Sequence, residues 1–249
     1  MAIIQRNQAH WLKGPAVTRQ DLRATARGPY RLVLLGAPGV GKGTQAELMN
    51  ERLGVCHLST GDVFRAAKDL SAAELTPALQ EALDYMRRGE LVPDSTVLAL
   101  VRERMRCLRC PGGFLLDGFP RTVPQAEALT ELLRSERLQL DAVLDYEMPI
   151  EQIVARLSGR RTCPNCRAVF HVTTRPPKVA EVCDNCGSPL AIREDDRPAS
   201  IRVRMAAYEK STAPLSEYYR KLGLLVQVSA EGAPEEIYQR TVQALEERP

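Results

Sequence analysis

The sequence predicts an α/β fold in which a parallel β-sheet is covered by helices on both faces. Three observations support this prediction. Short apolar runs recur along the chain, stretches with helical spacing separate them, and proline or glycine marks many of the boundaries. Alternation of this kind is typical of parallel sheets, whose strands are buried on both faces. The apolar runs occupy residues 31–35, 55–58, 114–116, 142–146 and 224–228.

The composition is that of a globular protein and argues against two classes of partner. With 44% hydrophobic and 26% charged residues in 249, the chain is able to bury a sizeable core. It contains no apolar run of 18 residues, so we expect no membrane-spanning helix. The formal net charge of +3 is small, and we expect no nucleic-acid partner. Because nothing in the sequence indicates secretion, we expect a cytoplasmic protein.

Residues 1–29 precede the first predicted strand and are expected to form an N-terminal extension. The first 30 residues hold five arginines or lysines and one acidic residue, Asp21. Lys13 interrupts the apolar residues around Trp11, so a secretory signal peptide is not predicted. A basic, acid-poor segment is also typical of organelle transit peptides. That alternative stays open beside a disordered arm or a short helix on the core.

The first predicted strand leads into the glycine-rich loop Gly36-Ala-Pro-Gly-Val-Gly-Lys-Gly-Thr44. The glycines allow successive backbone amides to face one anion, and the following helix contributes its positive end. Lys42 is then placed to reach the outer phosphates of a nucleotide. The usual motif has serine or threonine directly after the lysine, whereas here Gly43 takes that place. The strand, loop and helix context still predicts a phosphate-binding loop and a nucleotide-handling protein.

Charged residues also follow the second and third predicted strands. Asp62 and Arg65 follow the second strand, and Asp117 and Arg121 follow the third. A carboxylate at such a strand end is able to hold Mg²⁺ through its water shell. An arginine is able to bind phosphate with two parallel hydrogen bonds. For any one arginine a surface salt bridge is the alternative, but beside the loop the set favours phosphate binding; its later members are Arg156, Arg160, Arg193 and Arg204.

A structural zinc site is predicted between the fourth and fifth strands. Two Cys-x2-Cys pairs lie sixteen residues apart, a spacing typical of zinc-binding turns. Four thiolates close the coordination shell and leave no position for a catalytic water. Two disulfides are the alternative, which the lack of any sign of secretion disfavours. The four cysteines are Cys163, Cys166, Cys183 and Cys186.

The remaining cysteines are interpreted as having no special role. Cys107 and Cys110 form a third Cys-x2-Cys pair without a second pair at workable spacing, and we interpret it as incidental. A redox or metal function of this pair is the less favoured alternative. Cys56 is expected to be a small buried residue on a strand.

With these motifs in place, the chain resembles the adenylate kinases with a zinc-containing lid, within the nucleoside monophosphate kinase family. The resemblance extends from about residue 31 to the C-terminus. In this family, glycine after the lysine of the loop is the usual form. The matching segments are Gly36 to Gln45, Leu58-Ser-Thr-Gly-Asp62, Leu115-Leu-Asp-Gly-Phe-Pro-Arg121, Gly159-Arg-Arg161 and Arg193-Glu-Asp-Asp196.

The resemblance implies a fold and an activity. The implied fold is a five-stranded parallel P-loop NTPase core at residues 30–59, 93–158 and 197–249, with an AMP-binding insert at 60–92 and a zinc-ribbon lid at 159–196. The implied activity is reversible phosphoryl transfer from Mg-ATP to AMP, which gives two ADP, in a monomer. The AMP phosphate is largely ionised at neutral pH, so no protein base is expected. Positioning, electrostatics and exclusion of water by the lid supply the rate.

The resemblance further implies a role for individual residues. Asp195 and Asp196 are expected to pair with the later arginines. Catalysis is expected to involve Lys42, Arg121, Arg156, Arg160, Arg193 and Arg204. ATP is expected to bind Gly39, Val40, Gly41, Lys42, Gly43, Thr44, Arg156 and Arg160. AMP is expected to bind Thr60, Arg65, Met86, Glu90, Val92, Gly118, Arg121, Gln125, Arg193 and Arg204. Asp117 is expected to hold Mg²⁺ through water, and structural Zn²⁺ to bind Cys163, Cys166, Cys183 and Cys186.

Two alternative functions stay open on the sequence alone. The first is a UMP or CMP kinase; Thr60 and Gln125 favour AMP, while residues 66–90 depart from the family pattern. The second is a nucleic-acid-binding zinc module with a regulatory nucleotide switch. Against it, few basic residues lie between the cysteine pairs, and Phe170 and His171 are the only candidates for base stacking there.

Overall fold

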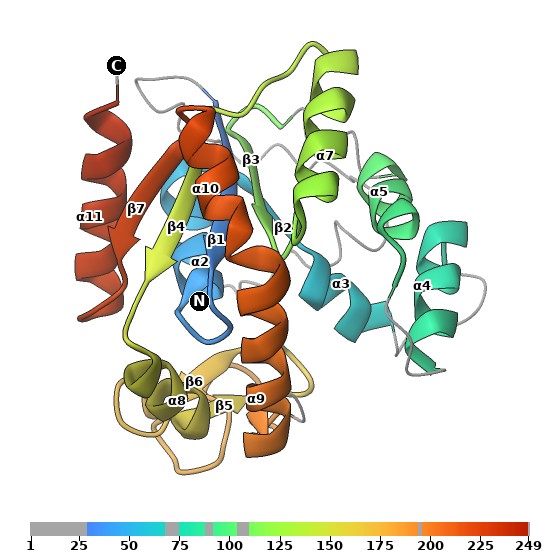
Figure 1. Cartoon of the computed structure of the whole chain (residues 1–249). Coiled ribbons are helices and arrows are strands. Elements are labelled where there is room, and N and C mark those ends of the chain that lie inside the picture. Colours follow the sequence, from blue (N-terminus) through green and yellow to red (C-terminus); the bar gives the residue numbers. More distant parts are fainter. Residues whose placement is uncertain (1–28, 68–74, 88–91, 104–109, 194–195, 249) are drawn as a thin grey trace.

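The computed structural model describes residues 29–67, 75–87, 92–103, 110–193 and 196–248. Its centre is a five-stranded sheet in the order β2-β3-β1-β4-β7, in which every neighbouring pair of strands is parallel. The predicted fold class is confirmed, and each of the five apolar runs lies in or overlaps a strand (Figure 1). The strands are β1 (Tyr30–Gly36), β2 (Cys56–Ser59), β3 (Gly113–Asp117), β4 (Ala142–Glu147) and β7 (Leu225–Ser229).

Two hydrophobic cores, one on each face, hold helices against the sheet. Alternate residues of β1 enter different cores, because successive side chains of a strand point to opposite faces. Leu32 and Leu34 pack with Met49, whereas Val33 and Leu35 pack with Leu129. The core around Met49 includes residues of α2 (Lys42–Leu53) and α11 (Pro234–Glu246). The core around Leu129 includes residues of α3 (Thr60–Ala67), α4 (Pro77–Arg87), α5 (Asp94–Glu103), α7 (Val123–Ser135) and α10 (Pro214–Lys221).

A separate group of elements lies beyond the carboxyl ends of β4 and β7 (Figure 1). It consists of α8 (Ile150–Gly159), an antiparallel pair of strands, β5 (Arg160–Thr162) and β6 (Val169–His171), and α9 (Pro198–Ala207). Cysteines and apolar side chains between β5 and α9 form a small core of their own, which includes Phe170 and Leu190. A π-helical turn, η3 (Tyr208–Thr212), connects α9 to α10.

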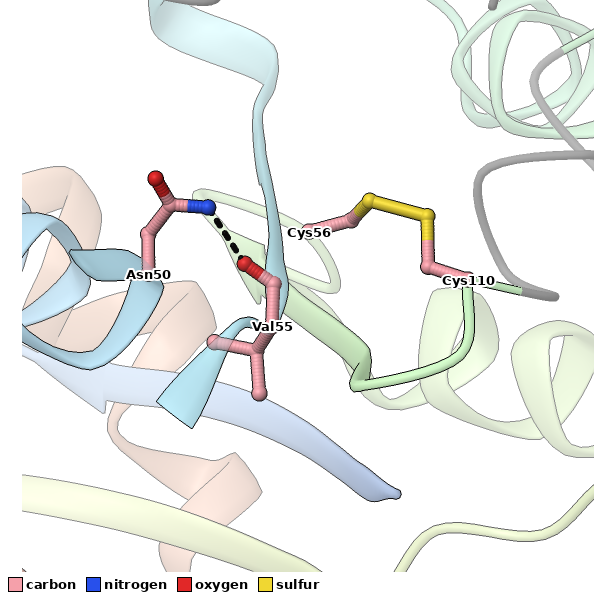
Figure 2. The surroundings of a disulfide bond; sticks show 4 residues. All are labelled: Asn50, Val55, Cys56 and Cys110. Carbon is pink, nitrogen blue, oxygen red and sulfur yellow. Dashed lines mark hydrogen bonds between the residues drawn. A yellow bond between two sulfur atoms is a disulfide. The ribbon is translucent and has the colours of Figure 1, made fainter. Parts of the chain in front are cut away.

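The structure corrects the interpretation of two cysteines. Cys56, at the start of β2, forms a disulfide with Cys110, just before β3, with a Cα–Cα distance of 6.3 Å (Figure 2). Cys56 is therefore not an isolated buried residue, and Cys110 is not incidental. The reason is the sheet: β2 and β3 are parallel neighbours, with Cys56 in register with Phe114, so their starts lie side by side. Cys107 lies outside the described residues.

The connection into β2 is fixed close to this disulfide. The Asn50 side chain at the end of α2 donates a hydrogen bond of 2.5 Å to the carbonyl of Val55 (Figure 2). Gly54 ends the helix in the left-handed conformation, with φ of 67°. The start of β2 is thus held to α2 by a hydrogen bond and to β3 by a disulfide.

Candidate active site

The glycine-rich loop leaves the amino end of α2 open for an anion. Gly41 is the N-cap of α2 with φ of 116°, and neither a capping side chain nor an acidic residue occupies the first turn. The first amides of a helix have no partner within it, so a bound anion is able to accept from them. At Gly39, with φ of 90°, a Cβ would lie 2.6 Å from Cγ of Leu157, so this position requires glycine. The loop therefore has the geometry of a phosphate site.

Lys42 lies within this loop. Its Nζ donates to the carbonyl oxygens of Gly36 at 2.6 Å and Ala37 at 3.0 Å. Burial lowers the pKa of Lys42 to about 8; the charge of Asp117 opposes this shift, and that of Arg121 adds to it. A phosphate bound beside Nζ would favour the protonated form, so the lysine is a cation placed for an anionic ligand.

Asp117 ends β3 beside this lysine. Its Oδ2 lies 3.6 Å from Nε2 of His57 on β2. Burial alone would raise the pKa of Asp117, but the interaction with His57 and the charge of Lys42 hold it below its ordinary value. The carboxyl group is therefore ionised at neutral pH, as a ligand for the water shell of Mg²⁺ must be. Nothing in the sequence around His57 indicated this contact, which depends on the pairing of β2 with β3.

Four of the residues predicted to bind AMP form one hydrogen-bonded cluster, here called the acceptor cluster: Thr60, Gly118, Arg121 and Gln125. The carbonyl of Gly118 accepts from Nε of Arg121 at 2.7 Å and from Oγ1 of Thr60 at 3.0 Å. The backbone amide of Arg121 donates to Oε1 of Gln125 at 2.7 Å. A Cβ at Gly118 would lie 2.8 Å from Oγ1 of Thr60, so glycine keeps the cluster compact. Strand β3 and the start of α7 thus bring the cluster together.

Arg156 links the loop to the segment after β7. From α8, its Nη1 donates to the carbonyl of Val40 at 3.0 Å, and its Nη2 to those of Ala230 at 2.9 Å and Gly232 at 3.3 Å. The guanidinium is therefore fixed at one side of the phosphate loop. Its position in the last turn of α8 gives no local sign of these contacts.

Two further arginines share one buried carboxylate. Nε of Arg160 donates to Oδ2 of Asp196 at 2.7 Å, and its Nη2 donates to Oδ1. Nη1 of Arg204 lies 3.5 Å from the same Oδ1, and the Asp196 side chain is fully buried. The expected pairing of Asp196 with these arginines is present. One carboxylate between two guanidinium groups leaves a net positive charge for an anionic ligand.

Electrostatic effects connect Arg121 and Arg204 with the loop. The charges of both Arg121 and Arg204 lower the pKa of Lys42, which places the two arginines within electrostatic reach of it. Nε of Arg193 donates to Oγ1 of Thr162 at 2.9 Å. Several of the predicted catalytic cations therefore surround one region beyond the strand ends.

The structure also brings the four predicted zinc ligands together. The Sγ atoms of Cys163, Cys166, Cys183 and Cys186 all lie within 4.8 Å of one another. Two of the Sγ–Sγ distances, from Cys163 to Cys186 and from Cys166 to Cys183, are 3.4 Å. A tetrahedral ion with Zn–S bonds of about 2.3 Å requires sulfur atoms about 3.8 Å apart. The four sulfur atoms, which form no disulfide, fit that geometry.

Some predicted residues fall outside this description. Glu90 and Asp195 are not among the described residues, nor are the side chains of Arg65 and Met86. Val92 is half-buried and packs against the sheet core that contains Leu129.

Two contacts to the acceptor cluster were not predicted from the sequence. Thr212 of η3 donates from Oγ1 to the carbonyl of Arg121 at 3.1 Å. Asp94, at the start of α5, accepts from Nε2 of Gln125 at 2.5 Å. The sequence offers one local signal for Asp94: an aspartate directly after a proline is typical of a helix start.

The two candidates for base stacking, Phe170 and His171, both make contacts within the zinc-bearing segment. Phe170 is only 5% exposed and belongs to the small core. Arg175 lies 6.0 Å from the centre of its ring. Nδ1 of His171 interacts with the backbone amides of Thr173 and Thr174, which draws the ring back onto its own turn.

Comparisons with known proteins agree with this geometry. The family model described as Adenylate kinase matches residues 34–224. A protein of Streptomyces avermitilis named adenylate kinase is 49% identical over 216 residues, which cover 86% of this chain and 96% of the relative. Another with that name, from Carboxydothermus hydrogenoformans, is 47% identical over 87% of this chain and 99% of its own length. A third, from Thermodesulfovibrio yellowstonii, is 46% identical over 88% of this chain and its whole length.

Proposed function

The chain belongs to the adenylate kinase family, and on that premise we propose how its residues divide the work of phosphoryl transfer between ATP and AMP. It is a nucleoside monophosphate kinase with nucleotide substrates. The observation that carries the assignment of roles is the uncapped N-terminus of α2, with Lys42 inside the loop and Asp117 beside it.

The ATP phosphates are assigned to the loop. Backbone amides of residues 39–44 face the phosphates at the amino end of α2, and Lys42 exchanges its carbonyl partners for phosphate oxygens. The Arg156 guanidinium, fixed between Val40 and Ala230, borders the nucleotide on one side. Adenylate kinases use Mg²⁺ with ATP, and Asp117 is the ionised carboxylate that would hold it through water.

The AMP site is assigned to the acceptor cluster. Arg121 would bind the AMP phosphate while its Nε remains bonded to Gly118. Thr60, Gln125 and Val92 would face the base. Arg65, Met86 and Glu90 stay AMP ligands predicted from the sequence alone. With this assignment the acceptor phosphate would lie at the carboxyl end of β3, where Asp117 lies, so that both substrates would meet at the strand ends.

Transfer itself requires no base from the protein. An oxygen of the AMP phosphate attacks the γ-phosphorus of ATP while the bond to the β,γ-bridging oxygen breaks, so one ADP leaves as the other forms. Charge on the transferred group is met by Lys42, Arg121 and the Asp196-linked pair, Arg160 and Arg204, with Arg193 and Arg156 at the rim. Because water competes with AMP, the lid would have to close over this step.

The zinc is assigned a structural role. The four sulfur atoms around the small core would complete a tetrahedral shell, which leaves no position for substrate or water. Bound Zn²⁺ would keep the four thiols deprotonated and tie the two turns of the lid together.

The organisation of the chain beyond the fold is likewise our proposal. The separate small core around the cysteines supports residues 159–196 as a lid. The packing of α3 against α4 supports residues 60–92 as an AMP-binding insert. Residues 1–29 are assigned as an extension. A monomer is expected, and gel filtration with light scattering tests it.

We also propose a cytoplasmic location. Among the described residues, no helix is long and apolar enough to cross a membrane. The free thiols of the zinc site suit a reducing compartment, whereas the Cys56–Cys110 disulfide would have to resist reduction there. Trapping of thiols in intact cells, followed by mapping of both sites, tests the location: a reduced zinc site supports it, and oxidation of those four cysteines contradicts it.

The assay that tests the assigned function compares AMP, CMP and UMP as acceptors with Mg-ATP as donor. Diphosphate products are quantified directly for each acceptor. We expect a strong preference for AMP. A preference for CMP or UMP would mean that residues 60–92 form a pyrimidine site, and no transfer to any acceptor would overturn the assigned roles.

A further inference from the structure

The side-chain amide of Gln125 is held at both ends by the protein. Its Oε1 accepts from the backbone amide of Arg121 at 2.7 Å, and its Nε2 donates to Oδ1 of Asp94 at 2.5 Å. A backbone N–H only donates and an ionised carboxylate only accepts, so a single orientation of the amide satisfies both partners. Gln125 is also 5% exposed, which leaves little room for other rotamers.

Asp94 is itself held in place by the neighbouring helix. Its Oδ2 accepts from Oγ1 of Thr122 at 3.3 Å, and that hydroxyl oxygen accepts from the backbone amide of Gln125 as the N-cap of α7. Asp94 also begins α5, where a negative charge is favoured by the helix dipole. The starts of α5 and α7 are thus joined through one carboxylate, which faces the Gln125 amide.

The fixed amide keeps one free hydrogen on Nε2 and one free lone pair on Oε1. This pattern of donor beside acceptor complements the edge of adenine, on which N1 accepts and the 6-amino group donates. A 6-oxopurine presents the reverse pattern, because its N1–H donates and its O6 accepts. A site rejects a ligand strongly when donors of the site face donors of the ligand and acceptors face acceptors.

We propose that Asp94 is a specificity-determining positioning residue: it fixes the Gln125 amide in the orientation that selects a 6-aminopurine acceptor over a 6-oxopurine. Asp94 acts through Gln125 and does not touch the acceptor. The proposal rests on the assigned function, which places the base of AMP against Gln125.

The test replaces the carboxylate with a group of the same shape, as Asp94→Asn. An asparagine amide presents either an oxygen or an N–H to Gln125, so the Gln125 amide is no longer confined to one orientation on that side. We expect the ratio of kcat/KM for AMP to that for IMP to fall at least tenfold, with the KM for ATP unchanged. Asp94→Ser, which keeps a side chain suited to a helix start, is expected to change the ratio in the same direction.

The matched control is Glu103→Gln, which removes one negative charge from the other end of α5. Glu103 accepts from the backbone amide of Ala78 at 3.3 Å, a bond that glutamine preserves. This variant is expected to keep the wild-type ratio. If Asp94 served only the stability of α5, its variants would lose activity toward AMP and IMP equally.

The two possible failures are distinguishable. If folded Asp94→Asn and Asp94→Ser both keep the AMP to IMP ratio within twofold of wild type, Asp94 does not set the specificity. If the wild-type protein itself fails to phosphorylate AMP, the assigned function fails before any variant is compared.

Discussion

Replacement of Lys42 by methionine should abolish transfer and yet make the protein more stable at neutral pH. Burial lowers the lysine pKa from 10.5 to about 8. At about 1.4 kcal/mol for each pH unit, this difference corresponds to about 3 kcal/mol by which the buried charge destabilises the fold. The figure is an upper value, because the side chain is half-buried and makes two hydrogen bonds that methionine loses.

The pH dependence of this effect has a definite sign. The folded protein releases the Lys42 proton at a lower pH than the unfolded chain does, so the unfolded state binds more protons between about pH 8 and pH 10.5. As the pH rises through this window, the free energy of unfolding of the wild type therefore increases by up to about 1.4 kcal/mol per pH unit relative to that of Lys42→Met. The variant's excess in unfolding free energy is at its full value below about pH 8 and decreases above it.

The assay is urea unfolding of both proteins at pH 7, 8, 9 and 9.5, together with the rate of ADP formation from ATP and AMP. The rate should fall on the order of 10³-fold or more, since a cation at the transferring group is lost. The control Lys221→Met removes a lysine that is 75% exposed and should change neither quantity. A Lys42→Met variant that is less stable at pH 7, that keeps a constant difference up to pH 9.5, or that remains active would contradict the proposed destabilising and catalytic roles of the Lys42 charge.

The remaining predictions concern the zinc site, the disulfide and the shared carboxylate. Elemental analysis should find one zinc per chain, and a chelator should lower the melting temperature; absence of zinc with an unchanged melting temperature would contradict the four-cysteine site. The double variant Cys56→Ser with Cys110→Ser should lose up to about 4 kcal/mol of unfolding free energy in urea, since the bond spans 54 residues. Peptide mapping should find the disulfide unchanged in Cys107→Ser, and a loss of the bond there would show that the pairing is different. Asp196→Asn should destabilise the protein by about 3 kcal/mol and slow transfer at least tenfold, because two guanidinium groups lose their common partner; unchanged stability in urea would argue against this pairing.

The fold could be predicted largely because its signals are local. An apolar run becomes a buried strand wherever it lies between two layers of helices, and Leu32 to Leu35 are buried in this way. The phosphate loop is equally local, because its conformation depends on the glycines at 36, 39 and 41. The cysteine spacing also predicted which sulfur atoms would meet.

Other contacts could not be read from the sequence because they depend on which elements become neighbours. Cys56 meets Cys110 only because β2 pairs with β3. In the sequence, Cys107 is much nearer to Cys110 and forms the familiar Cys-x2-Cys spacing with it. Asp94 reaches Gln125 only because α5 and α7 begin at the same place. The motif identified Gln125 as a ligand candidate, but the groups that orient it come from a segment 31 residues away.

The central claim is that this site passes the γ-phosphoryl group of ATP directly to AMP and excludes water. The most direct test follows ATP labelled in the γ-phosphate through a single turnover, with and without AMP, and separates ADP from inorganic phosphate. Direct transfer predicts that the label moves to ADP when AMP is present and that almost no phosphate is released in its absence. Release of labelled phosphate at the same rate with and without AMP would identify a hydrolytic switch and contradict direct transfer.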